Sequence, residues 1–234
     1  MNAECASVRG EHRPGADRAG LDLVTFQDHP YQSAFLDTWT LLGYVAASTS
    51  RARPAGDVHP PALRPPAVLA QAAASLDILS GGRLEPALGA GAFWDAIAAM
   101  GGPRRSPGEA VEALDEAIRI IRASWDTRAP GDIRVKGRHY LDGLGRGPRP
   151  AHDIGIRIGA YKPRMLRLVG RAADGWLPSP PSLGGPGRIA GCDAVIDQAA
   201  EEAGRSPRSI RRLLDLGRPM PAEHSRAWTG GAPV

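Results

Sequence analysis

A short segment at Gly159–Lys162 has the residue types of an anion-binding turn. The apolar residues 154–159 predict a strand, and Pro163 suits the first position of a helix because its missing N–H costs nothing there. Leu166 and Val169 then recur at helical spacing. A helix N-terminus that faces a strand end offers free N–H groups and a favourable dipole to a phosphate. The turn therefore predicts either a phosphate-bearing ligand or an ordinary strand-to-helix connection.

Other arrangements of reactive side chains give weaker signals. Gly89-Ala90-Gly91 follows an apolar segment, as in a dinucleotide-binding loop, but Trp94 stands where the third glycine would be. None of the six histidines has the spacing of a zinc motif, and two cysteines do not make a metal set. His59 and His152 are interpreted as loop residues. The sequence therefore predicts no metal site.

Composition predicts one soluble globular domain of 234 residues. The net charge of +4 comes from 29 basic and 25 acidic residues, and the arginines are dispersed, so we expect no nucleic-acid partner. No apolar run reaches the roughly 18–20 residues of a membrane span, and the N-terminus lacks the apolar core of a secretory signal. We therefore expect no membrane association and a cytoplasmic location.

The order of the predicted elements is that of an α/β protein. Strands are predicted at 21–26, 51–58, 84–88, 133–135, 154–159, 175–178 and 210–216, and helices at 37–47, 66–80, 107–125, 163–173 and 189–203. Such alternation favours a parallel sheet, either open and doubly wound or closed into a barrel. Residues 1–18 are predicted to be a disordered lead-in, 19–216 the domain and 217–234 a disordered tail.

Several blocks resemble the bacterial-luciferase-like superfamily of flavin- and deazaflavin-dependent oxidoreductases. They are LVTFQDHP at 23–30, PPAVLAQAAASLD at 65–77 with SGGR at 80–83, LGAG at 88–91, GRHY at 137–140 and the segment 159–175. The resemblance covers about residues 19–216 and implies a (β/α)8 TIM barrel. It also implies FMN or coenzyme F420 as cofactor and monooxygenation or hydride transfer on a small organic substrate. Homodimers are common in such a family, so a homodimer is expected.

The resemblance assigns roles residue by residue. His29 matches the histidine that lies near the ring of the cofactor and the substrate, where an imidazole can act as acid or base. Asp57 and Val58 match a bulged, sometimes cis, peptide that supports the ring. The remaining matches are to backbone turns and polar groups around the cofactor and its phosphate: Gly89, Ala90, Gly91, Gly159, Ala160, Tyr161, Lys162 and Ser179.

The chain also departs from the family pattern. Lys162 stands where glycine is common, and Ala92 stands where sugar-phosphate dehydrogenases often carry a catalytic glutamate, which argues against that subgroup. Pro54 and Pro86 fall in predicted strands, where each removes a ladder donor. The first and eighth barrel strands are not evident, so we expect an incomplete barrel. Two alternatives follow: a non-catalytic remnant or partner subunit that keeps the scaffold, and a phosphate-binding protein without the chemistry.

Overall fold

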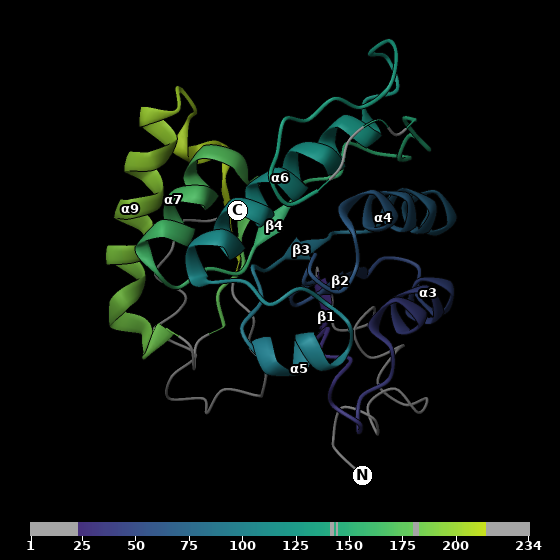
Figure 1. Ribbon diagram of the computed structural model, residues 1–234, viewed down its shortest axis with the longest axis horizontal. Coiled ribbons are helices and arrows are strands. Elements are labelled where there is room, and N and C mark those ends of the chain that lie inside the picture. Colours follow the sequence, from purple (N-terminus) through teal and green to yellow (C-terminus); the bar gives the residue numbers. More distant parts are fainter. Residues whose placement is uncertain (1–22, 141–142, 144, 180–182, 214–234) are drawn as a thin grey trace.

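The computed structural model describes residues 23–140, 143, 145–179 and 183–213 (Figure 1). The strands are β1 (Leu23–Phe26), β2 (Arg53–Gly56), β3 (Ala87–Leu88), β4 (Arg157–Ile158), β5 (Gly175–Trp176) and β6 (Arg211–Arg212). The helices are α3 (Thr38–Ser48), α4 (Pro66–Ser80), α5 (Trp94–Ala99), α6 (Pro107–Trp125), α7 (Pro163–Ala172) and α9 (Ile189–Glu202), with 3-10 turns η1 (Pro186–Arg188) and η2 (Pro207–Ser209). Strands and helices therefore alternate as the sequence predicts.

All strand pairs in the described residues are parallel, and they follow the order of the chain. β1 pairs with β2, and β3 to β6 form the second set. The N–H of Glu85 donates to the carbonyl of Pro54 at 3.1 Å, and that of His59 donates to Ala87 at 2.8 Å, so the two sets are continuous. A doubly wound sheet reverses its strand order at a switch point, and this sheet does not. The architecture is the wall of a (β/α) barrel that does not close within the described residues.

Local sequence signals explain where the longer helices begin and end. Ser106 and Glu109 cap α6 reciprocally, and Pro107 occupies its first position. The α4 helix ends at Gly81, whose φ of 70° lies in the left-handed region that glycine tolerates. The inner face of α6 buries Leu114, among others, against the strands. These helices form because capping and an apolar face agree.

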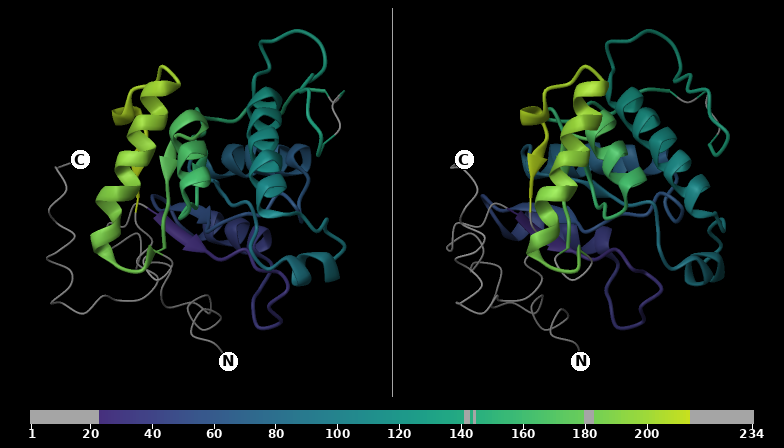
Figure 2. Two further views of the ribbon diagram at one scale, coloured as in Figure 1. Left: turned by 60° about the vertical axis from the view of Figure 1, so that its left-hand side comes forward. Right: turned by 90° about the vertical axis from the view of Figure 1, so that its left-hand side faces the viewer.

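Close helix packing fixes the second half of the sheet. Helices α7 and α9 lie side by side in both views of Figure 2. A Cβ on Gly170 would lie within 3.0 Å of the backbone carbonyl of Ile196, so only glycine allows this approach. Ile196 and Val169 are fully buried where the two helices meet the core.

The structure corrects some expected elements. Residues 133–135 are not a strand: Ile133 is buried and its carbonyl accepts a hydrogen bond from Gly143, but no neighbouring strand pairs with it. Helix α5 was not expected. Pro54 and Pro86 are accommodated, and their carbonyls accept hydrogen bonds from Glu85 and Arg157. The predicted lead-in (1–18) and tail (217–234) lie outside the described residues.

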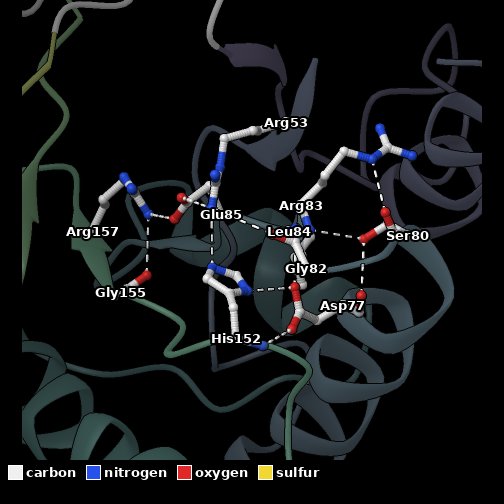
Figure 3. Close-up of polar contacts among 10 residues, drawn as sticks. All are labelled: Arg53, Asp77, Ser80, Gly82, Arg83, Leu84, Glu85, His152, Gly155 and Arg157. Carbon is white, nitrogen blue, oxygen red and sulfur yellow. Dashed lines mark hydrogen bonds and ion pairs between the residues drawn. The ribbon is translucent and has the colours of Figure 1, made fainter. Parts of the chain in front are cut away.

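A buried polar network closes the N-terminal ends of the strands (Figure 3). Glu85 pairs with Arg53 at 2.6 Å and with Arg157, and both Glu85 and Arg157 are buried. His152 donates or accepts between the buried carboxylate of Asp77 at 2.8 Å and Arg53 at 3.1 Å. His152 is therefore a structural link, not merely a loop residue. Charges at the N-terminal face of a barrel typically serve stability.

Candidate functional site

Three of the predicted cofactor segments meet at Val58. The half-buried side chain of Val58 lies against the backbone of Gly89 and Gly159, which follow β3 and β4. A Cβ on Gly89 would approach Val58 Cγ2 closer than 3.0 Å, and one on Gly159 would lie 3.0 Å from Val58 Cγ1. The peptide bond between Asp57 and Val58 is cis. The carboxyl ends of β2, β3 and β4 therefore form one cradle, lined by backbone and one aliphatic side chain.

The turn after β3 also depends on glycine. Gly91 has a φ of 94°, and a Cβ there would lie 3.0 Å from Trp94 and 3.2 Å from Ile97. The half-buried Ala90 packs on the main core. The loop between β3 and α5 is thus held close to the cradle by small residues.

The N-terminus of α7 offers uncapped donors at the same end of the sheet. Lys162 is the N-cap with φ −102° and ψ 150°, and no side chain caps the first turn. The φ of Lys162 is negative, so the lysine does not obstruct the turn. Its ammonium forms no ion pair within the described residues and is exposed. The helix dipole and a free ammonium therefore both favour an anion here.

Neighbouring residues fix this turn. The carbonyl of the buried Ala160 accepts a hydrogen bond from Trp176 Nε1 at 3.0 Å, and Tyr161 packs on the core. Leu177 donates to the carbonyl of Ile158 at 3.0 Å, which brings the segment after β5 alongside. Ser179 is half-buried in that segment, at the same edge of the sheet.

His29 lies in an aromatic cluster with Tyr31 and Phe93. The ring of His29 stacks on Tyr31 with centroids 5.3 Å apart and meets Phe93 edge-on at 5.4 Å; Tyr31 and Phe93 are 5.6 Å apart. The first two follow β1, and Phe93 is the N-cap of α5. The cluster therefore bridges the C-terminal ends of β1 and β3, with β2 and the cradle between them.

A buried Asp–His pair supports this cluster, and sequence reasoning missed it. His59 Nδ1 lies 2.6 Å from Asp28 Oδ2, with His59 0% and Asp28 8% exposed. The imidazole stacks on Trp39 at 4.6 Å, and it packs so closely on Gly56 that a Cβ there would collide with it. The pair ties the segment that carries His29 to the segment after β2. Asp28, next to His29, and His59, next to Val58, were the available signals.

The carboxylate of Asp28 also acts on Tyr31. Burial, with the negative charge of Asp28, raises the pKa of Tyr31 to about 12. The phenol therefore stays protonated through the physiological range, and it can donate a hydrogen bond.

A separate cavity of about 640 Å³ lies at the opposite, N-terminal end of the strands. It is lined by the end of α6 and by residues 149–154, with Arg122, Arg128 and Arg149 at its wall. None of the predicted site residues lines it. Within the described residues, no group of three or more histidine, cysteine, aspartate or glutamate side chains could hold a metal ion. No helix in that part of the chain is long and apolar enough to span a membrane.

Fold and site together define a (β/α)-barrel protein with a glycine-lined, anion-favouring cradle at the C-terminal face. The sequence profile of the luciferase-like monooxygenases matches residues 11–227. The chain belongs to this family.

Individual relatives include enzymes with different substrates. An F420-dependent glucose-6-phosphate dehydrogenase of Amycolatopsis mediterranei is 28% identical over 227 residues, covering 93% of this chain and 66% of the relative. A phthiodiolone/phenolphthiodiolone dimycocerosates ketoreductase of Mycobacterium kansasii is 33% identical over 188 residues, covering 77% and 48%. The chain thus spans about half to two thirds of the length of these relatives.

A solved structure confirms the fold. An F420-dependent secondary alcohol dehydrogenase in complex with an F420-acetone adduct superposes with a TM-score of 0.79 at 21% identity, covering 91% of this chain and 64% of that one. At this identity the likeness concerns the fold, and it agrees with the incomplete barrel of the described residues.

Proposed function

We propose that this protein is an oxidoreductase that binds coenzyme F420 at the C-terminal face of its barrel and transfers hydride to or from a small organic substrate. The observation that carries the proposal is the convergence of Val58, Gly89 and Gly159 beside the uncapped α7 N-terminus. The names of two relatives, an F420-dependent dehydrogenase and an F420-dependent alcohol dehydrogenase, support F420 over FMN.

The residues present fit such a cofactor. Glycines at 89 and 159 leave backbone exposed to a flat ring, and Val58 forms an apolar floor beneath it. The first turn of α7, with Lys162 and Ser179, would hold the anionic tail. When bound, F420 supplies the hydride or accepts it.

His29 would hold the proton of the reaction. Its ring is fixed from two sides by Tyr31 and Phe93, and it lies one strand away from the cradle. An imidazole titrates near neutrality, so it can give a proton to a substrate oxygen or remove one. The Asp28–His59 pair keeps the segment that carries His29 in place.

Titration of the purified chain with F420 and with FMN, followed by fluorescence and thermal unfolding, tests the proposal. Saturable F420 binding should stabilise the fold by about 2.7 kcal/mol at a hundredfold excess over Kd. Preferential FMN binding would instead favour the monooxygenase alternative. A cooperatively folded chain that binds neither would favour the non-catalytic remnant or partner subunit.

The two lysines of the chain provide a matched pair of variants. Lys162→Ala should weaken cofactor binding about two- to fivefold at low salt, because an exposed charge contributes up to ~1 kcal/mol. The difference should shrink as salt screens the charge. Lys136→Ala removes an equally exposed lysine outside the site and should leave Kd unchanged. The expected homodimer and cytoplasmic location stay predictions.

A further inference from the structure

The aromatic cluster around His29 indicates a substrate class, an inference that rests on the proposed function. Phe93 is 52% exposed although it is a large apolar side chain, and Tyr31 is half-buried beside it. The three rings contact one another at centroid distances of 5.3–5.6 Å. An exposed ring beside a reactive histidine offers apolar surface to a bound molecule.

The charges near the cluster disfavour an anion. The segments that carry the rings, residues 27–37 and 88–100, contain no lysine or arginine. Their acidic residues are Asp28, Asp37 and Asp95. Of these, Asp28 lies close enough to Tyr31 to contribute to its raised pKa. A phosphate ester at His29 would meet a carboxylate and find no cation on either segment, and so would be repelled.

We propose that the site takes a neutral ketone, or the corresponding secondary alcohol, with an aromatic or bulky aliphatic body that packs on Phe93 and Tyr31. In the reducing direction the carbonyl carbon accepts a hydride from the reduced deazaflavin. The carbonyl oxygen takes a proton from His29, the C=O double bond becomes single, and the deazaflavin is left oxidised. The cluster is thus a specificity determinant that would reject sugar phosphates.

Binding to the F420-loaded protein tests the proposal without relying on turnover. Acetophenone and glucose 6-phosphate are titrated separately by calorimetry, with saturation-transfer NMR to map the contacts. Acetophenone should bind, with saturation transferred to its ring protons, and glucose 6-phosphate should bind at least tenfold more weakly. Phe93→Ala should weaken acetophenone about tenfold, which corresponds to ~1.4 kcal/mol, whereas F420 binding should not change.

Met100→Ala is the matched control, since Met100 is 50% exposed beyond α5 and contacts none of the three rings. Tighter binding of glucose 6-phosphate than of acetophenone, or an acetophenone Kd that Phe93→Ala leaves unchanged, would overturn the inference while the proposed function stands. Failure of the wild-type protein to bind F420 would overturn the proposed function instead.

Discussion

The contact between Val58 and Gly89 gives a quantitative prediction for the cradle. A Cβ on Gly89 would overlap Val58 Cγ2 and lie 3.4 Å from Val58 Cβ. Gly89→Ala should therefore cost about 1–3 kcal/mol of unfolding free energy through overpacking. Valine is stiff at χ1, so the side chain cannot turn away cheaply. When Val58 is first changed to alanine, the remaining 3.4 Å separation is an ordinary contact, and most of the cost should disappear.

A double-mutant cycle measures this coupling by urea unfolding, followed by circular dichroism. Replacing glycine also stiffens the unfolded chain by about 0.4–1 kcal/mol, but that contribution is equal in both backgrounds and cancels. We expect a coupling energy of about 1–2 kcal/mol between the two sites. Gly159→Ala, whose nearest approach to Val58 is 3.0 Å, should show a smaller one. Additive costs, with no coupling, would refute the packing of Val58 over Gly89.

Two further predictions concern buried carboxylates. Glu85→Ala should cost about 3–5 kcal/mol of unfolding free energy, because it leaves the buried guanidinium of Arg157 unpaired; urea unfolding would show it, and a loss below ~1 kcal/mol would contradict the pairing. Burial acts to raise the pKa of Glu116, but backbone N–H groups of Arg138 and His139, at 2.6 and 2.9 Å, hold that pKa below its ordinary value. Its contribution is therefore present above about pH 4.3 and is lost as pH falls through the lowered pKa. The stability advantage of the wild type over Glu116→Gln should shrink between pH 5 and about pH 3, and a pH-independent difference would count against this role.

Local signals made much of the fold predictable from the sequence. The capping box at Ser106 and the proline at 163 mark helix starts that the structure confirms. Strand lengths were less predictable: residues 154–159 are apolar, yet β4 spans only Arg157–Ile158. Strand pairing depends on neighbours that come from elsewhere in the chain, so periodicity alone overestimates strands, as it did at residues 133–135.

The polar pairs were not predictable for a related reason. Asp28 and His59 are 31 positions apart, and Arg157 and Glu85 are 72 apart. Each pair forms because neighbouring parallel strands align the same level of the barrel, and that register appears in no short motif. The glycines at 89 and 159, in contrast, lie in recognisable strand-to-helix turns. Their shared neighbour Val58 is known only once the three strand ends are placed together.

The two ends of the barrel wall use their residues differently. At the N-terminal end, Glu85 and Asp77 are buried and spend their hydrogen-bonding capacity on partners inside the protein. At the C-terminal end, the first turn of α7 has no side-chain cap, and Phe93 keeps half its surface exposed. Satisfied charges lower the free energy of the folded state, whereas unsatisfied donors and exposed rings cost stability unless a ligand covers them. The C-terminal face is therefore the face that gains most from binding, and the cavity of about 640 Å³ at the other end is not the place to expect the cofactor.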